Sequence, residues 1–542
     1  MNKILILDFG SQTTALIGRR IREAGVYTDI ISGDTPLTDT ILKDVKGIIL
    51  GGSPESVYAN GILPDQRIYK LDLPLLGICY GLQRMTTDLG GKVETLSKRE
   101  YGSVDVILND ITKEILNSKA AAFFKAFSPK ELQVGVTELF FKTWMSHGDS
   151  LSKLAPGFVQ CAASKTGFPA ITAHKTKPWF GLQFHPEVSH CENGSAILRA
   201  FAIDVCGCKK TWSMEKYLES AVEDLQNRVQ DNEVLLLISG GVDSTVAGAM
   251  LLKALDPKNV HLMYMDTGLM RKNETEIVGA SLKKLGAKNL HIIHCADEFF
   301  SALANKTQPE EKRRIIGDLF IKIQEREVAR LGLKPNYLLA QGTLYTDLIE
   351  SGKGVGNKAH VIKSHHNVGS PLVAAKRSAG LIIEPLDKLY KDEVRSLGIL
   401  LNLDSAVVHR HPFPGPGLAV RIIGDVTPEK CRILREADYI FMEELKKRLT
   451  LDGAKTLYDD IWQAFAVLLP INSVGVAGDV RKYGQVLSLR AVTSSDGMTA
   501  DVYPFPAKDL LEISTMITNS VPEIGRVCYD ISSKPPATIE WE

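Results

Sequence analysis

Several features are absent from this sequence of 542 residues, and each absence argues against a class of protein. No apolar run reaches the length of a membrane span, so no binding to or crossing of a membrane is expected. Basic and acidic residues balance at 64 each, which argues against a nucleic-acid-binding protein. The eight cysteines lack the paired spacing of a zinc site. Reduced thiols, and no signal peptide before Ile4–Leu7, predict a cytoplasmic protein.

Short apolar runs alternate with amphipathic segments along most of the chain, which is typical of α/β proteins. In a first predicted domain, residues 1–206, buried strands are expected at Ile4–Leu7, Gly47–Leu50 and Leu73–Ile78. In a second, residues 207–416, they are expected at Leu235–Ile238, His261–Met265, Leu290–His294 and Tyr337–Ala340. The polar turns after these strands should share one edge of a parallel sheet, where ligands bind.

Residues 417–542 predict a small α+β domain. Its expected strands are Ala419–Ile423, Val486–Thr493 and Arg526–Ile531, and its expected helices are Glu429–Lys447 and Ala507–Asn519. The predicted fold class is therefore α/β, with two successive doubly wound, mostly parallel α/β domains followed by a small α+β domain.

The segment SGGVDST, Ser239–Thr245, lies between an apolar run and a helical segment that is expected from Val246. Such a junction presents unpaired N–H groups and a positive dipole end to an anion. No Walker lysine follows, and the segment instead resembles the pyrophosphate loop of ATP pyrophosphatases, which adenylate a substrate oxygen. ATP is therefore expected at this loop and at Asp266, after the next strand; the loop residues are Ser239, Gly240, Gly241, Val242, Asp243, Ser244 and Thr245.

A second chemistry is indicated by Cys79, which ends an apolar strand in PLLGICYGLQ where a helix is expected to begin. An elbow there exposes the sulfur, and the helix N-terminus favours thiolate. In GLQFHPE, His185 and Glu187 would lie on one face of a strand, as the base and its orienting carboxylate. Backbone N–H groups near Gly52 and at Tyr80 can stabilise an oxyanion.

The CYGLQ and HPE segments are similar to those of class I glutamine amidotransferases, which release ammonia from glutamine through a thioester. This resemblance implies that the glutamine is held by Gln83 and by the segment MSHGD, with Ser146, His147 and Asp149. Asp149 would pair with the α-ammonium group.

The order of these two halves resembles the glutamine-hydrolysing GMP synthases along essentially the whole chain, including the segments HPFPGPGLAVR and KPPATIEWE. The resemblance implies that ATP, with Mg²⁺, adenylates xanthosine monophosphate (XMP) and that ammonia displaces AMP. No tightly bound organic cofactor is expected, no metal ligand is assigned, and residues 417–542 would form a homodimer. XMP would be held by Arg313, Gln463, Arg526, Lys534 and Glu540. A lid over the nucleotides would contain Asp347, Glu350, Lys363, His365 and His366.

Two alternatives use the same kind of loop. One is another adenylating amidotransferase, although asparagine synthetases need an N-terminal cysteine and position 2 is Asn2. The other is an RNA-modifying sulfur transferase, which would need a basic face and a working cysteine, for which Cys295 is the only candidate. A glutamine sensor without activity is disfavoured because both sets of catalytic residues are intact.

Overall fold

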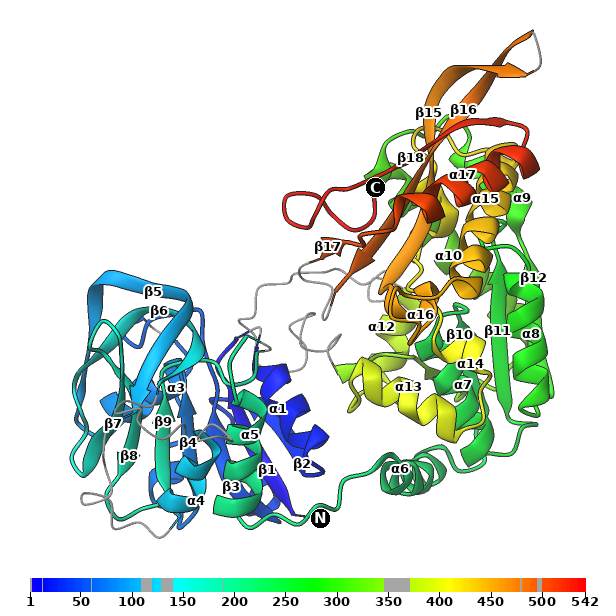
Figure 1. The fold of residues 1–542 in the computed structure, drawn as a ribbon. Helices are drawn as coiled ribbons and strands as arrows, with labels where there is room; N and C mark the ends of the chain where they lie inside the picture. Colours follow the sequence, from blue (N-terminus) through cyan, green and yellow to red (C-terminus); the bar gives the residue numbers. More distant parts are fainter. Residues whose placement is uncertain are drawn as a thin grey trace. The chain divides into compact units, whose positions relative to one another are not determined.

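The structure is a computed structural model that describes residues 2–11, 13–59, 61–108, 119–127, 140–188, 190–345, 371–477, 480–494 and 500–542. It divides into two compact units (Figure 1). The first comprises the described residues up to Tyr217, and the second comprises Leu218–Leu344 with the described residues from 371 onwards. The five predicted lid residues, Asp347, Glu350, Lys363, His365 and His366, lie outside the described residues.

The first unit is built on a nine-stranded sheet with the order β2-β1-β3-β4-β9-β8-β7-β5-β6 (Figure 1). Its strands are β1 (Lys3–Asp8), β2 (Tyr27–Ser32), β3 (Val45–Leu50), β4 (Leu75–Ile78), β5 (Lys92–Leu108), β6 (Phe140–Lys153), β7 (Phe158–Ser164), β8 (Pro169–His174) and β9 (Trp179–Leu182). Its main helices are α1 (Thr14–Glu23), α2 (Asp39–Leu42), α3 (Tyr80–Asp88), α4 (Ala120–Phe124) and α5 (Gly194–Arg199), and α6 (Met214–Val229) begins at its end.

Alternate residues of the central strands pack into different cores. Ile4 and Ile6 belong to one hydrophobic cluster, whereas Leu5 and Leu7 belong to another. Both faces of this sheet are therefore covered, as in other α/β proteins. The predicted α/β class is confirmed, but only the pairings from β2 to β9 are parallel, and the remaining four strands extend the sheet antiparallel.

The second unit contains a parallel sheet with the order β12-β11-β10-β13-β14. Its strands are β10 (Val234–Ile238), β11 (Val260–Asp266), β12 (Asn289–His294), β13 (Leu338–Ala340) and β14 (Ile382–Ile383). The helices around it are α7 (Val242–Ala254), α8 (Glu274–Lys284), α9 (Ala296–Leu303), α10 (Pro309–Leu331), α12 (Pro371–Ser378), α13 (Lys391–Leu400) and α14 (Ser405–Val408). Each of the four predicted strands forms, so the polar turns that follow them do share one edge.

The same unit contains a second, smaller sheet. Its strands are β15 (Gln463–Ala477), β16 (Val480–Thr493), β17 (Asp501–Val502) and β18 (Ile524–Tyr529), and its helices are α15 (Pro428–Lys447), α16 (Leu457–Asp460) and α17 (Ala507–Ser520). Strands β15 and β17 run antiparallel to β16, while β18 runs parallel to it.

The predicted strand at Ala419–Ile423 is wrong, because Gly417–Arg421 forms the 3₁₀ helix η4. Every residue of η4 is buried, so its apolar run reflects burial on all sides rather than strand alternation. One hydrophobic cluster joins Leu235 of β10, Leu418 of η4 and Leu489 of β16. The predicted division into domains at 207 and 417 stays a prediction. Among the described residues, no helix is long and apolar enough to span a membrane.

Candidate active sites

Cys79 occupies a strained turn between β4 and α3. Its backbone has φ 51° and ψ −107°, and its N–H donates to the carbonyl of Leu182, at the end of β9, at 2.7 Å. A Cβ at Gly81 would lie 2.1 Å from the carbonyl oxygen of Leu50, so only glycine lets α3 begin this close to β3. A non-glycine residue with positive φ is costly, and such backbone strain is found more often at functional turns than elsewhere. The predicted turn between strand and helix is confirmed, but the expected exposure of the sulfur is wrong, because Cys79 is buried in a hydrophobic cluster.

His185 and Glu187 lie in the turns after β9, which ends at Leu182, and not on a strand as the sequence predicted. They still meet, with 2.7 Å between His185 Nδ1 and Glu187 Oε1, and both side chains are buried. The N–H of His185 donates to the carbonyl of Trp144 at 3.0 Å, which fixes the turn against β6.

The ring of His185 also interacts with the Cys79 thiol. Burial by itself lowers the pKa of His185, but the charge of Glu187 and the interactions with Cys79 outweigh it and raise this pKa well above its ordinary value. The imidazole is therefore influenced by both a thiol and a carboxylate, as expected for the predicted nucleophile, base and orienting group.

The oxyanion groups are only partly defined by the geometry. A Cβ at Gly52 would lie 3.6 Å from His185 Cε1 and 3.1 Å from Ser11 Oγ, so Gly52 borders the His185 ring. Tyr80 is the first residue of α3, where N–H groups have no helical partner. The oxyanion roles of Gly52 and Tyr80 stay predictions.

Three of the predicted glutamine-binding residues converge. The carbonyl oxygen of Asp149 accepts from Gln83 Nε2 at 2.8 Å and lies 2.9 Å from His147 Nδ1. Ser146 lies on β6 in register with Tyr101. The other ring nitrogen of His147 is 3.1 Å from Glu100 Oε2, and both side chains are buried.

Three further residues complete this site and were missed by sequence reasoning. Ser56 Oγ donates to Asp149 Oδ2 at 2.6 Å, and Thr95 Oγ1 donates to Oδ1 at 2.8 Å, which orients the carboxylate. Gln183 bridges the two groups of residues, because its Oε1 accepts from Gln83 at 3.3 Å and its Nε2 lies 3.8 Å from Cys79 Sγ. The predicted glutamine-binding residues and the thiol are therefore connected through Gln183.

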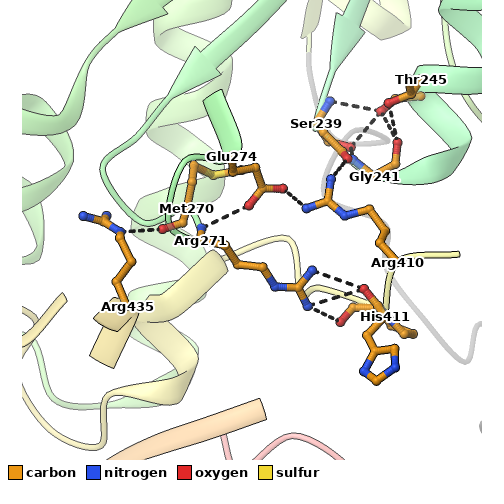
Figure 2. Close-up of polar contacts among 12 residues, drawn as sticks. Ser239, Gly241, Thr245, Met270, Arg271, Glu274, Arg410, His411 and Arg435 are labelled. Atoms are coloured by element: carbon orange, nitrogen blue, oxygen red, sulfur yellow. Dashed lines mark hydrogen bonds and ion pairs between the residues drawn. The ribbon is translucent and has the colours of Figure 1, made fainter. Parts of the chain in front are cut away.

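The SGGVDST loop joins β10 to α7, which begins at Val242 rather than at Val246 (Figure 2). Gly240 has φ +79°, which favours glycine. The N–H of Ser239 donates to Ser244 Oγ at 3.1 Å, and Thr245 Oγ1 donates to the carbonyl of Gly241 at 2.9 Å. These bonds hold the loop in a turn around the start of the helix, the position at which helices bind anions.

Two carboxylates lie at the same end of the sheet. Asp243 Oδ2 pairs with Lys391 Nζ at 2.5 Å, while its Oδ1 is buried without a hydrogen-bond partner among the described residues. Asp266 ends β11, where it accepts from the N–H of Gly268 at 3.1 Å. The Oδ1 of Asp243, unpaired among the described residues and beside the predicted phosphate site, suits Mg²⁺, which takes one or two carboxylates together with phosphate oxygens.

A network of charged residues contacts the loop at Gly240 and was not predicted from the sequence; we call it the arginine network (Figure 2). We use this name for Arg271, Glu274 and Arg410. The guanidinium of Arg410 donates to the carbonyl of Gly240 and pairs with Glu274 Oε1. Glu274 Oε2 accepts the N–H of Arg271 at 3.0 Å. The guanidinium of Arg271 donates to the carbonyl of His411 at 3.3 Å, and burial lowers its pKa to about 10.

Gln463 and Glu540, both predicted to hold XMP, contact each other, with 2.7 Å between Gln463 Nε2 and Glu540 Oε1. Arg421, which sequence reasoning missed, binds the same carboxylate in a bidentate pair with distances of 2.9 and 3.1 Å. Its guanidinium is fully buried and lies 4.2 Å from the centre of the Phe465 ring. Arg313 donates to the carbonyl of Glu542, which brings it to the same C-terminal segment.

Of the other two predicted XMP residues, Arg526 lies on β18 of the small sheet and Lys534 forms an isolated bridge outside the named strands. Arg526 pairs with Val486 of β16, six residues from Val492, the partner of Gln463. At about 3.3 Å per residue, the backbones of Arg526 and Gln463 are therefore roughly 20 Å apart along the strand. Lys534 exchanges backbone hydrogen bonds with Ala500 at 2.8 and 3.1 Å. Their roles stay predictions.

Comparison with known proteins assigns the family. The family model described as glutamine amidotransferase class-I matches residues 5–205, that of NAD synthase matches 213–343, and that of the GMP synthase C terminal domain matches 452–541. A curated GMP synthase (glutamine-hydrolyzing) of Xylella fastidiosa (strain 9a5c) is 45% identical over 544 residues, covering 100% of this chain and 99% of the relative. The one of Aquifex aeolicus (strain VF5) is 45% identical over 542 residues, covering 99% of each. With relatives this similar along its whole length, the chain belongs to the family of glutamine-hydrolysing GMP synthases.

Proposed function

We propose that the first unit hydrolyses glutamine and that the second uses the ammonia to make GMP from XMP. The observation that carries this proposal is the Cys79–His185–Glu187 arrangement, continuous with Asp149. His185 takes the thiol proton, and the sulfur attacks the side-chain amide carbon of glutamine. The resulting oxyanion would be met by N–H groups near Gly52 and Tyr80. His185 then gives its proton to the leaving ammonia, and water hydrolyses the thioester.

In the second unit, a purine carbonyl oxygen of XMP attacks the α-phosphorus of ATP, and pyrophosphate leaves toward the loop at Ser239–Thr245. N–H groups at the start of α7 and the loop hydroxyls would hold this anion, in place of the bonds that Ser239 and Gly241 N–H make to Ser244 Oγ and Ser239 Oγ within the loop. Ammonia attacks the activated carbon, and AMP departs. Glu540, oriented by Arg421 and Gln463, would accept hydrogen bonds from the acceptor nucleotide. Mg²⁺, held by Asp243 and Asp266, would neutralise phosphate charge.

The products test this function directly. Purified protein with glutamine, Mg²⁺-ATP and XMP should yield GMP, AMP, pyrophosphate and glutamate in equal amounts, measured by ion-exchange chromatography. ADP and phosphate in place of AMP and pyrophosphate would rule out adenylation. Formation of AMP with no GMP would point instead to another acceptor, as in the alternative adenylating enzymes.

We also propose that the hairpin of β15 and β16 forms the contact of a homodimer. Its apolar side chains are more than half exposed at Val474, Val476, Val480 and Tyr483. Exposed apolar clusters of this kind mark protein interfaces, and a second copy of the chain is the expected partner. The variant Val476→Asp should convert a dimer to a monomer in light scattering, whereas Leu511→Asp, an exposed change on α17, should not. A wild-type monomer would contradict the proposal. A cytoplasmic location stays a prediction.

A further inference from the structure

The peptide that joins Gly240 to Gly241 is the most adaptable part of the pyrophosphate loop. Neither residue has a side chain, and Gly240 already has φ +79°. The N–H of Gly241 is held weakly, by Ser239 Oγ at 3.3 Å. Little within the loop itself therefore determines which way this peptide faces.

Arg410 constrains the orientation of this peptide from outside the loop, because its guanidinium donates to the carbonyl oxygen of Gly240 (Figure 2). The C=O and N–H of a trans peptide point in opposite directions. A cation that holds the carbonyl of Gly240 on one side therefore directs the N–H of Gly241 to the other. Hydrogen bonds from a charged donor are stronger than neutral ones, and they polarise the peptide that accepts them.

Glu274 in turn fixes Arg410. Its Oε1 pairs with the Arg410 guanidinium, and its Oε2 accepts the N–H of Arg271 at 3.0 Å. A Cβ at Gly240 would lie 3.1 Å from Glu274 Oε1, so this carboxylate lies directly against the loop. The side chain of Glu274 is only 3% exposed and that of Arg410 14%, which leaves neither free to change partners with solvent.

We propose that Arg410, held by Glu274, is the positioning residue of the pyrophosphate site, and that it keeps the Gly240–Gly241 peptide turned so that its N–H faces the anion. Arg410 acts through this peptide and through its positive charge, without contacting the substrate. The inference rests on the proposed function only in naming ATP and pyrophosphate as the ligands of the loop. It predicts a defect in anion binding that is separate from the binding of the acceptor nucleotide.

Calorimetric titration of the full chain with Mg²⁺-pyrophosphate tests this directly and requires no turnover. The variant Arg410→Gln should bind pyrophosphate about 10-fold more weakly, as expected for the loss of a charge-assisted hydrogen bond. Ammonia-driven synthesis should show a similar rise in KM for ATP, with KM for XMP within about twofold of wild type. Arg326→Gln is the matched control, because Arg326 is half exposed and pairs with Glu298, away from the loop.

Two further variants separate positioning from folding. Arg410→Lys keeps the charge and should recover part of the pyrophosphate affinity, whereas Glu274→Gln should weaken it although Arg410 is intact. Unchanged pyrophosphate affinity in Arg410→Gln would overturn the inference. Equal losses of ATP and XMP affinity would also overturn it, because they indicate a general structural role. If the wild type made no GMP while Arg410→Gln still bound pyrophosphate weakly, the proposed function would fail and this inference would stand.

Discussion

Arg271 and Gln463 donate to the same carbonyl oxygen, that of Pro412, at 3.0 and 3.4 Å. Arg271 belongs to the arginine network behind the pyrophosphate loop, and Gln463 binds Glu540 in the proposed acceptor site. The two proposed nucleotide sites therefore share a backbone segment. Arg271→Gln should raise KM for both ATP and XMP in steady-state assays of ammonia-driven synthesis, by about 10-fold each. A rise in only one of them would show that Pro412 does not couple the sites.

Removal of the thiol should separate the two activities. Cys79→Ala should reduce glutamine-driven GMP synthesis by at least about 10³-fold, because no nucleophile remains to form the thioester. Ammonia-driven synthesis should stay within about twofold of wild type. Both rates follow from GMP measured by chromatography. Cys191→Ala serves as the control, since burial raises the pKa of that thiol to about 12 and it has no assigned role. Loss of both activities in folded Cys79→Ala would contradict independent sites.

The charge of Glu187 should set the pKa of His185. Glu187→Gln should lower this pKa, because the opposite charge 2.7 Å away is removed. NMR of ¹³C-labelled histidines in the full chain would measure it, with His185→Asn identifying the signal. An unchanged pKa in Glu187→Gln would show that burial and Cys79 alone control the ring.

The same pair makes stability depend on pH in a defined direction. Because folding raises the pKa of His185, its contribution is fully present below the unfolded value of about 6.5 and is lost as pH rises through the folded value. The difference in melting temperature between wild type and Glu187→Gln should therefore be larger at pH 6 than above the folded pKa of His185. Calorimetric scans across this range would show it, and a difference that grows with pH would contradict it.

The pair of fully buried Arg421 and partly exposed Glu540 should show non-additivity. Glu540→Gln should cost about 3 kcal/mol of stability, because the Arg421 guanidinium stays buried without its partner charge; Arg421→Met should cost less, because Glu540 is 19% exposed, and each variant should raise KM for XMP. The double variant should cost less than the sum of the two. Denaturant unfolding of the four proteins measures the coupling energy. Simple additivity would mean that solvent replaces the missing partner in each single variant.

His411 should make the second unit sensitive to acid. Its Nδ1 accepts the N–H of Ala464 at 3.0 Å, its Nε2 donates to the carbonyl of Tyr458 at 2.8 Å, and burial lowers its pKa to about 4. A lowered pKa gives stability that is present above about pH 6.5 and is lost as pH falls toward 4, by about 3 kcal/mol. Unfolding at several pH values should show this loss in wild type and a smaller one in His411→Gln. Equal losses would assign the acid sensitivity to other groups.

The parts of the two sites that could be predicted from the sequence are those with local signatures. Cys79 and the SGGVDST loop each combine a strand end, glycine and a helix start within a few residues, so the local pattern indicated a thiolate and an anion site, while the resemblance to known families implied the reactions. His185 and Glu187 were found as a pair although the strand predicted for them is absent. A turn brought them together instead, which alternation along a strand could not indicate.

The residues that were missed act over long sequence separations. Ser56 contacts Asp149 across 93 positions, Gln183 reaches Cys79 across 104, and Arg410 reaches Gly240 across 170. Arg421 lies in a helix that the sequence predicted as a strand, and its partner is 119 residues away. Nothing in the local composition of these segments marks such contacts, because they depend on how the sheets and helices pack.

The cluster shared by Leu235, Leu418 and Leu489 has a consequence for how the second unit unfolds. Side chains from the parallel sheet, from η4 and from the small sheet are buried against one another. Neither part can lose its structure without exposing apolar surface of the other, so the two should melt in one cooperative transition. The halves that would hold ATP and the acceptor nucleotide thus form a single folding unit, and their relative geometry is as stable as the fold itself.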